Sequence, residues 1–241
     1  SSESSDPISS EDPISSEPGE SSKDSSALPS SGTSKIDTPE KFYTEVNKQL
    51  TLEKAKLGTV SIDGGILKQT IDYWGPYFLN IPNDNILYES RLNTGITNPP
   101  GTRLGGWSIQ LSSYEVNEWI SGFSNLYAIT GNKAYKDKAI YLLDEWFKCF
   151  ERKSSGLIWY NSHYTLKRWI DACLDTYTYL GKTDSLAKID KLYTWAQRNL
   201  SKKKLFGDNG TEWYTLSEAF YHAYEVTKDK KYLDYAKTWE Y

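Results

Sequence analysis

The chain has 241 residues, of which 38% are hydrophobic, so it is long enough for one domain with a hydrophobic core and a tail. Its formal net charge of −4 argues against a protein that binds nucleic acid through a basic face. No apolar run approaches the ~18 residues that a membrane-spanning helix needs.

Residues 1–35 consist mainly of Ser, Glu, Asp and Pro, and the phrase Asp-Pro-Ile-Ser-Ser-Glu begins at both Asp6 and Asp12. Such a segment buries too little apolar surface to offset the entropy lost on ordering. We therefore expect a disordered acidic linker over 1–35 and a folded domain over 36–241. Linkers of this composition commonly hold a module away from a cell surface, which favours an extracellular or surface-tethered protein.

The folded domain begins with several short elements. A polar helix is expected over 38–56, followed by a short strand and turn over 60–65 and a helix over 67–79. The segment 85–95 begins as a helix and continues into a loop rich in Gly and Pro as far as residue 107. Loops of this length in a compact domain usually carry function or line a cleft.

One sequence pattern then occurs three times. It begins at Tyr127, Tyr177 and Tyr224, with offsets of 50 and 47 residues. A fixed period of this size is typical of a repeated supersecondary unit, because each unit buries its apolar face against its neighbours. Apolar residues recur at three- and four-residue steps on both sides of each turn, which predicts helical hairpins. We expect an all-α fold with three antiparallel helix pairs between residues 114 and 241.

Helix ends and core positions follow from the same pattern. Trp119 and Trp169 lie on the apolar stripes and are expected in the core. Cys149 and Cys173 also lie on apolar faces, which favours buried free thiols over a disulfide or a metal site. The residues expected to end the first helix of a pair or to cap the second are Gly131, Gly181, Asn132, Asp184 and Asp229.

The last predicted helix, over 230–241, stops in mid-pattern without a capping signal. A ring or solenoid of helix pairs that ended there would expose an apolar face. We therefore expect the chain to be part of a longer one, from which about half of a helical toroid, the C-terminal half, is missing.

Four motifs occur in the order of a known family. They are Arg91-Leu-Asn93-Thr-Gly95, Leu104-Gly-Gly-Trp107, Tyr164-Thr-Leu-Lys167-Arg168 and Glu212-Trp-Tyr-Thr-Leu-Ser-Glu218. Over residues 58–241 the chain resembles the N-terminal half of the catalytic domain of glycoside hydrolase family 127, the β-L-arabinofuranosidase family.

This resemblance implies an (α/α)6 barrel and a retaining hydrolase in which a zinc-held Cys thiolate is the nucleophile and a Glu is the acid/base. Cys149 and Cys173 do not match that Cys, so the catalytic residues are expected beyond Tyr241. Any zinc would belong to the full-length protein, since no metal site is visible in this sequence.

The chain departs from the family pattern at three histidines. Where the family has Gly-His-x-x-Gly-His, this sequence has residues 113–118, which end in Glu118. Where the family has Tyr-Thr-x-His-Lys, Lys167 replaces the His. These changes indicate a divergent branch and leave both the sugar specificity and the zinc chemistry open.

Superposing the repeats places the starts of the first helices together at one end of a toroid. Charged and aromatic side chains there suit a sugar, because they offer charge-assisted hydrogen bonds to hydroxyls and flat faces for the ring. Lys167 and Arg168 beside Asp171 could equally form a solvated salt-bridged face. His163 and His222 are expected to be surface or hydrogen-bonded residues rather than ligands. The candidate substrate-binding residues are Trp107, Glu118, Lys167, Arg168, Glu212, Trp213, Tyr214 and Glu218.

The sequence leaves two other functions open. A polysaccharide lyase or an unsaturated glucuronyl hydrolase could use Tyr214 for proton transfer and Arg168 to bind a uronate. A non-catalytic helical-repeat scaffold or carbohydrate-binding remnant would be favoured if the full chain lacked a downstream Glu-x-Cys and Cys-Cys cluster.

Overall fold

The computed structural model describes residues 59–105, 115–158, 162–202 and 213–240. Contacts divide the chain into the units Ser1–Glu53 and Lys54–Tyr241, and every described residue belongs to the second unit. The predicted linker over 1–35 and the predicted helix over 38–56 therefore lie outside the described residues. None of the described helices combines the length and the apolar character needed to cross a membrane.

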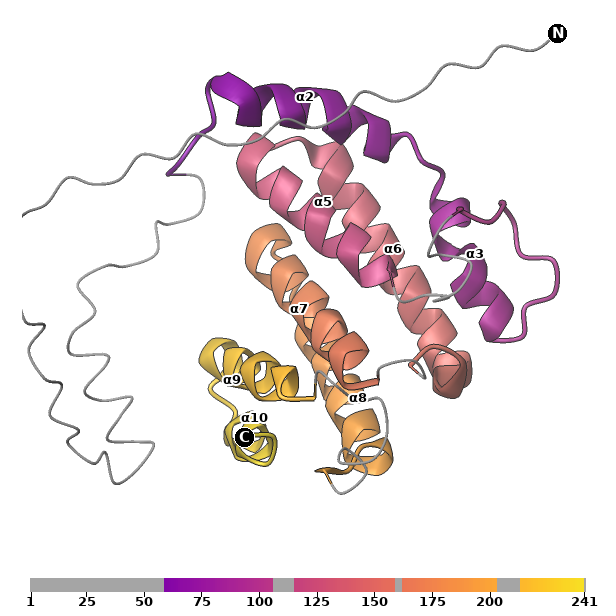
Figure 1. Ribbon diagram of the computed structural model, residues 1–241, viewed down its shortest axis with the longest axis vertical. Helices are drawn as coiled ribbons and strands as arrows, with labels where there is room; N and C mark the ends of the chain where they lie inside the picture. Colours follow the sequence, from indigo (N-terminus) through magenta and orange to yellow (C-terminus); the bar gives the residue numbers. More distant parts are fainter. Residues whose placement is uncertain (1–58, 106–114, 159–161, 203–212, 241) are drawn as a thin grey trace, which may run out of the picture. The chain divides into compact units, whose positions relative to one another are not determined.

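Within the described ranges every regular element is helical, which confirms the predicted all-α class. The short strand predicted over 60–65 is wrong. Residues 60–63 form no regular structure, since none of the described residues forms a strand beside them to accept their backbone hydrogen bonds. The elements are α2 (Gly65–Leu79), α3 (Asn83–Asn93), α5 (Val116–Thr130), α6 (Lys133–Lys153), the 3₁₀ turn η1 (Ser154–Gly156), α7 (Ser162–Leu180), α8 (Ser185–Asn199), α9 (Thr215–Thr227) and α10 (Lys230–Lys237) (Figure 1).

The three predicted helix pairs are present as α5–α6, α7–α8 and α9–α10, and the members of each pair contact one another. The first helices of successive pairs are also neighbours, because α5 packs on α7 and α7 packs on α9 (Figure 1). Helices α2 and α3 contact α6. The starts of α5, α7 and α9 therefore come from three repeats but belong to one row of adjacent helices.

Two of the three predicted caps open their helices as expected. Asn132 accepts a hydrogen bond from the backbone N–H of Ala134, and Asp229 accepts one from Lys231, each at 3.0 Å. The prediction for Asp184 is wrong, since its carboxylate makes no capping hydrogen bond. It instead accepts a hydrogen bond from Lys188 at 2.6 Å, because an ammonium group one turn away competes successfully for the same oxygen.

The turns between paired helices use left-handed backbone. Gly131 and Gly181 both have φ of 69°, as predicted for residues that end a helix. In the third repeat Lys228 occupies this position with φ of 59°. A residue with a Cβ pays a conformational penalty in this region, so the third turn is less favourable than the first two.

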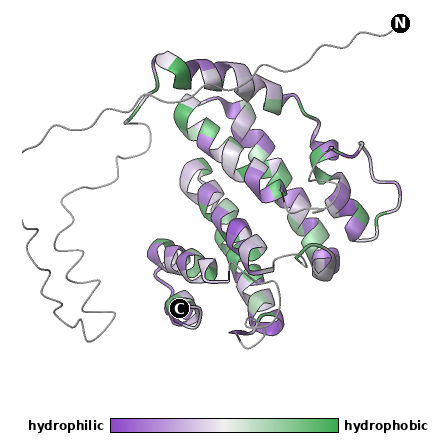
Figure 2. Ribbon diagram, in the orientation of Figure 1, coloured by the Kyte–Doolittle hydropathy of each residue, from purple (hydrophilic) through white to green (hydrophobic). Residues whose placement is uncertain are grey.

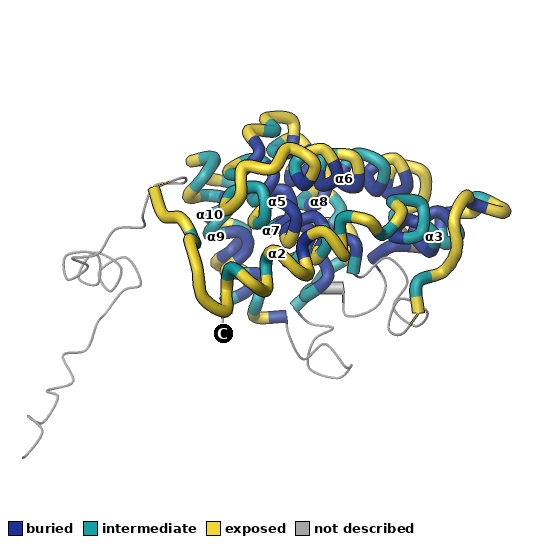
Figure 3. Tube along the Cα trace, turned by 90° about the horizontal axis from the view of Figure 1, so that it is seen from above, coloured by how far each residue is buried: buried dark blue, intermediate teal, exposed yellow. Residues whose placement is uncertain are grey.

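The core lies between the helices of successive pairs. Trp146 of α6 and Trp169 of α7 are fully buried and stack with ring centroids 3.4 Å apart, which confirms Trp169 as a core residue. Cys149 and Cys173 are buried free thiols, as predicted. Hydropathy alternates around each helix (Figure 2), and long buried segments run through α5 to α8 (Figure 3). Helix α2 differs, because only its Gly75 is buried.

Candidate functional site

An ion pair joins the first turn of α5 to the second turn of α7. The Arg168 guanidinium of α7 donates from Nε to Oε1 of Glu118 at 2.6 Å, and its Nη2 donates to the second carboxylate oxygen. This bidentate geometry is the strongest form of an Arg–carboxylate contact. The Glu118 side chain is 43% exposed, so one of its faces remains open to solvent.

A second set of contacts joins α7 to α9. Lys167 Nζ lies 2.8 Å from Asp171 Oδ2 on the same helix and 3.7 Å from Glu218 Oε2 on α9. The same Asp171 oxygen lies 3.6 Å from Arg168 Nη1, so it is shared by both cations. We call Glu118, Lys167, Arg168, Asp171 and Glu218 the charged array.

The two cations of the array remain charged despite partial burial. Burial lowers the pKa of Arg168, but the hydrogen bond and the charge of Glu118 outweigh it, and the pKa is raised overall. The same balance holds for Lys167, whose pKa is raised because Asp171 outweighs the burial. Three carboxylates surround two cations, so the array carries one net negative charge.

Two polar residues next to the array were not among the candidates predicted from the sequence. Asp175 lies one turn after Asp171 on α7, and burial raises the pKa of its carboxyl, with a further contribution from the Asp171 charge. Asn117 is 1% exposed, and neither polar atom of its amide has a partner among the described residues. Asp175 could have been predicted from the sequence, because it follows Asp171 at the i, i+4 spacing that places both on one face of a helix. Nothing in the sequence distinguished Asn117.

The other candidate residues are placed as follows. Trp213 is only 8% exposed and lies under the Lys202 ammonium, which is 5.2 Å from its ring centroid, so little of its ring face is open. Tyr214, immediately before α9, is 53% exposed. Trp107 and Glu212 lie outside the described residues. The structure therefore brings Glu118, Lys167, Arg168 and Glu218 together.

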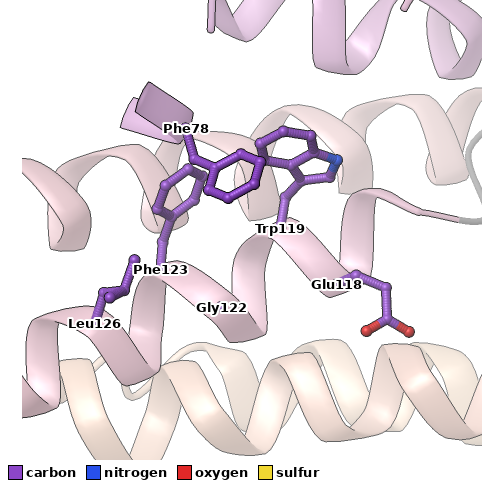
Figure 4. A pocket seen from close by; sticks show the side chains of 6 residues that line it. All are labelled: Phe78, Glu118, Trp119, Gly122, Phe123 and Leu126. Carbon is purple, nitrogen blue, oxygen red and sulfur yellow. The ribbon is translucent and has the colours of Figure 1, made fainter. Parts of the chain in front are cut away.

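An apolar hollow of about 280 Å³ lies beside Glu118 (Figure 4). Trp119 lines this hollow and is half-buried, packed against the buried core as its place on the apolar stripe predicted. Its ring meets that of Phe78 from α2 edge to face, with centroids 5.5 Å apart. The Glu118 carboxylate points away from these rings (Figure 4). The hollow is lined by Phe78, Glu118, Trp119, Gly122, Phe123 and Leu126.

Comparison with known families identifies the domain. The family model described as the β-L-arabinofuranosidase, GH127 catalytic domain, matches residues 59–241. The chain belongs to this family. GH127 is an α/α toroid family, so the successive helix pairs of the structure are part of such a toroid. A search of the curated proteins found no match.

Two members of the charged array are the residues predicted from the sequence to replace family histidines. Glu118 and Lys167 are both ion-paired, to Arg168 and to Asp171 respectively.

The residues of the described part do not fit the zinc that the family resemblance implies. No three His, Cys, Asp or Glu side chains there lie close enough together to hold a metal ion. Burial raises the pKa of the Cys149 thiol and that of the Cys173 thiol, whereas a zinc ligand must be a thiolate. The imidazole of His163 packs against Trp239, with ring centroids 5.3 Å apart.

Proposed function

We propose that this GH127 domain supplies one wall of the sugar site of a retaining β-L-arabinofuranosidase-type hydrolase that acts on polysaccharide or glycan side chains. The observation that carries the proposal is the charged array, which connects the N-terminal halves of three adjacent helices. The family match supports the hydrolase class. We propose the sugar and the linkage as part of this function, and we propose that the protein is secreted or tethered to a cell surface.

The array is suited to holding a sugar by its hydroxyls. Glu118 and Glu218 have side-chain exposures of 43% and 74%, and each carboxylate has more acceptor sites than its cation occupies. A hydroxyl can therefore donate to the Glu118 carboxylate, which Arg168 already fixes, or to the Glu218 carboxylate, which lies near the Lys167 ammonium. Because these partners restrain the acceptors before the sugar arrives, less ordering is needed on binding.

The same pairing argues that the array orients the substrate and does not cleave it. A retaining glycosidase needs a nucleophile about 5 Å from a second carboxyl group that can hold a proton. Both carboxylate oxygens of Glu118 accept hydrogen bonds from Arg168, so the protein holds this group in place, which suits it to orienting a sugar. We propose that the catalytic Cys and Glu lie outside the described residues, beyond Tyr241 in a longer chain.

The uronate-directed alternative receives less support from the geometry. A uronate-binding site would need a cation whose charge is available to the sugar carboxylate. Arg168 is engaged by Glu118 and Asp171, and Lys167 by Asp171 and Glu218. An acidic sugar would have to displace a protein carboxylate and would meet one net negative charge, so a neutral sugar is favoured.

The sugar-binding part is tested on the 241-residue chain by calorimetric titration with a disaccharide that ends in β-L-arabinofuranose. We expect Glu218→Gln to weaken binding by roughly five- to tenfold, equivalent to one charge-assisted hydrogen bond. Glu225→Gln, on the exposed surface of the same helix α9, is the matched control and should bind like the parent. Equal affinities of the Glu218 variant and the parent, or binding of a uronate disaccharide in place of the arabinoside, would refute the proposed site.

The hydrolytic part is tested separately on the longest product of the gene. Release of L-arabinose from the same disaccharide is measured with and without a zinc chelator. Chelator-sensitive release supports the family chemistry. Binding without any release would keep the sugar site but reject the hydrolase.

A further inference from the structure

Helix α2 exposes an unusual number of aromatic side chains. Tyr73, Trp74, Tyr77 and Phe78 are 71%, 46%, 56% and 38% exposed, on a helix that buries only Gly75 (Figure 3). Trp119 of α5 continues the set into the apolar hollow (Figure 4). We call these five residues the aromatic track. Contiguous exposed apolar surface of this kind generally marks a binding site.

The rings of the track touch one another in sequence. Ring centroids lie 5.0 Å apart for Tyr73 and Trp74, 5.5 Å for Trp74 and Tyr77, and 5.3 Å for Tyr77 and Phe78. The last step, from Phe78 to Trp119, is again 5.5 Å. These four contacts are edge to face, so these neighbouring rings turn their faces in different directions, whereas Trp74 and Phe78 are stacked with their centroids 5.9 Å apart.

The track ends at the proposed sugar site. On α5, Trp119 directly follows Glu118, which belongs to the charged array. The hollow at this end is lined by both residues. A ligand that follows the rings from the middle of α2 therefore reaches the residue next to Glu118, whose carboxylate is directed to the other side of Trp119 (Figure 4).

We propose that the aromatic track binds a neutral polysaccharide chain and leads it to the charged array. The identification of the ligand as carbohydrate rests on the proposed function, whereas the track itself is an observation on α2 and α5. A sugar chain presents apolar ring faces with hydroxyls at their edges, which matches exposed aromatic faces flanked by the Tyr73 and Tyr77 phenols.

Charge on α2 supports a neutral ligand. Its Lys68 is paired with Asp72, with Nζ and Oδ1 2.5 Å apart, and no other basic residue occurs between Gly65 and Leu79. A lipid surface would be expected to meet a basic amphipathic face, and an acidic polymer would need unpaired cations. Neither feature is present on this helix.

The test uses affinity electrophoresis of the 241-residue chain in native gels that contain soluble arabinan, with polygalacturonate as the acidic comparison. We expect arabinan, but not polygalacturonate, to retard the parent chain. Trp74→Ala and Tyr77→Ala should each weaken retardation by roughly tenfold in apparent Kd. Tyr141→Ala, which removes a 41% exposed aromatic ring of α6 outside the track, should leave it unchanged. Circular dichroism confirms that each variant is folded.

The outcomes separate this inference from the proposed function. Loss of arabinan binding in the track variants, with disaccharide binding retained, supports the track. Arabinan binding that depends on the track, combined with no disaccharide binding, keeps the track and refutes the charged array. Arabinan binding that is insensitive to Trp74 and Tyr77 overturns the track. So does a parent chain that ignores arabinan but forms a dimer that Trp74→Ala dissociates, because the occupant would then be a second copy.

Discussion

His163 provides a sharp test of how this fold responds to acid. Its ring packs against Trp239, and its Nε2 atom is buried without a partner among the described residues. The expectation of a surface or hydrogen-bonded histidine is therefore wrong for this atom. Burial lowers the pKa of His163 from 6.5 to about 4, because the imidazolium would lose hydration that no neighbour replaces.

The sign of the effect follows from proton binding. In the unfolded chain the imidazole takes up its proton near pH 6.5, whereas the folded chain does so only near pH 4. Between these values the unfolded state holds more protons, so the free energy of unfolding falls as the pH falls. This single group should remove about 2 kcal/mol by pH 5 and about 3 kcal/mol by pH 4.

The perturbation is His163→Phe, which keeps a flat ring against Trp239 and removes the titrating group. Urea unfolding followed by circular dichroism at pH 7, 5 and 4 gives the free energy of unfolding of parent and variant. We expect the variant to gain about 3 kcal/mol relative to the parent between pH 7 and pH 4. His222→Gln controls for the removal of a histidine from the chain. Parallel pH profiles of parent and His163→Phe would refute the buried, neutral imidazole.

Two further predictions concern backbone geometry and helix packing. Lys228→Gly should raise the free energy of unfolding by about 1 kcal/mol, because glycine adopts the left-handed turn without the penalty that Lys228 pays at φ 59°; an unchanged urea midpoint would contradict this reason. Gly75→Ala should lower the free energy of unfolding by about 1 to 3 kcal/mol, because a Cβ there would lie 2.3 Å from the Tyr135 phenol oxygen. This clash should outweigh the higher helix propensity of alanine. Adding Tyr135→Phe removes that oxygen and should restore part of the loss in the same unfolding assay, and no recovery would mean that the close approach is not the cause.

The sequence was sufficient for the helical pairs because their signals are local. A stripe at three- and four-residue steps, a glycine such as Gly131 at the end of a helix and a cap such as Asn132 each act within one or two turns. The same locality explains why Trp169 could be assigned to the core. The family motifs likewise predicted the GH127 domain that the comparison shows.

Some predictions made from the sequence failed where a non-local partner decides the structure. The segment 60–63 has strand-like alternation, but a strand forms only beside another strand. Asp184 has the identity and position of a cap, yet Lys188 takes its carboxylate.

The candidate site was only half determined by the sequence. The repeat offsets placed Glu118, Lys167 and Arg168 at equivalent positions near the helix starts. They did not determine which of the charged side chains form ion pairs. Pairing of Glu118 with Arg168, and of Lys167 with both Asp171 and Glu218, depends on how far α5, α7 and α9 are rotated and shifted against one another. That register is set by the packing of the buried side chains between the helices, and such packing is a property of the tertiary structure alone.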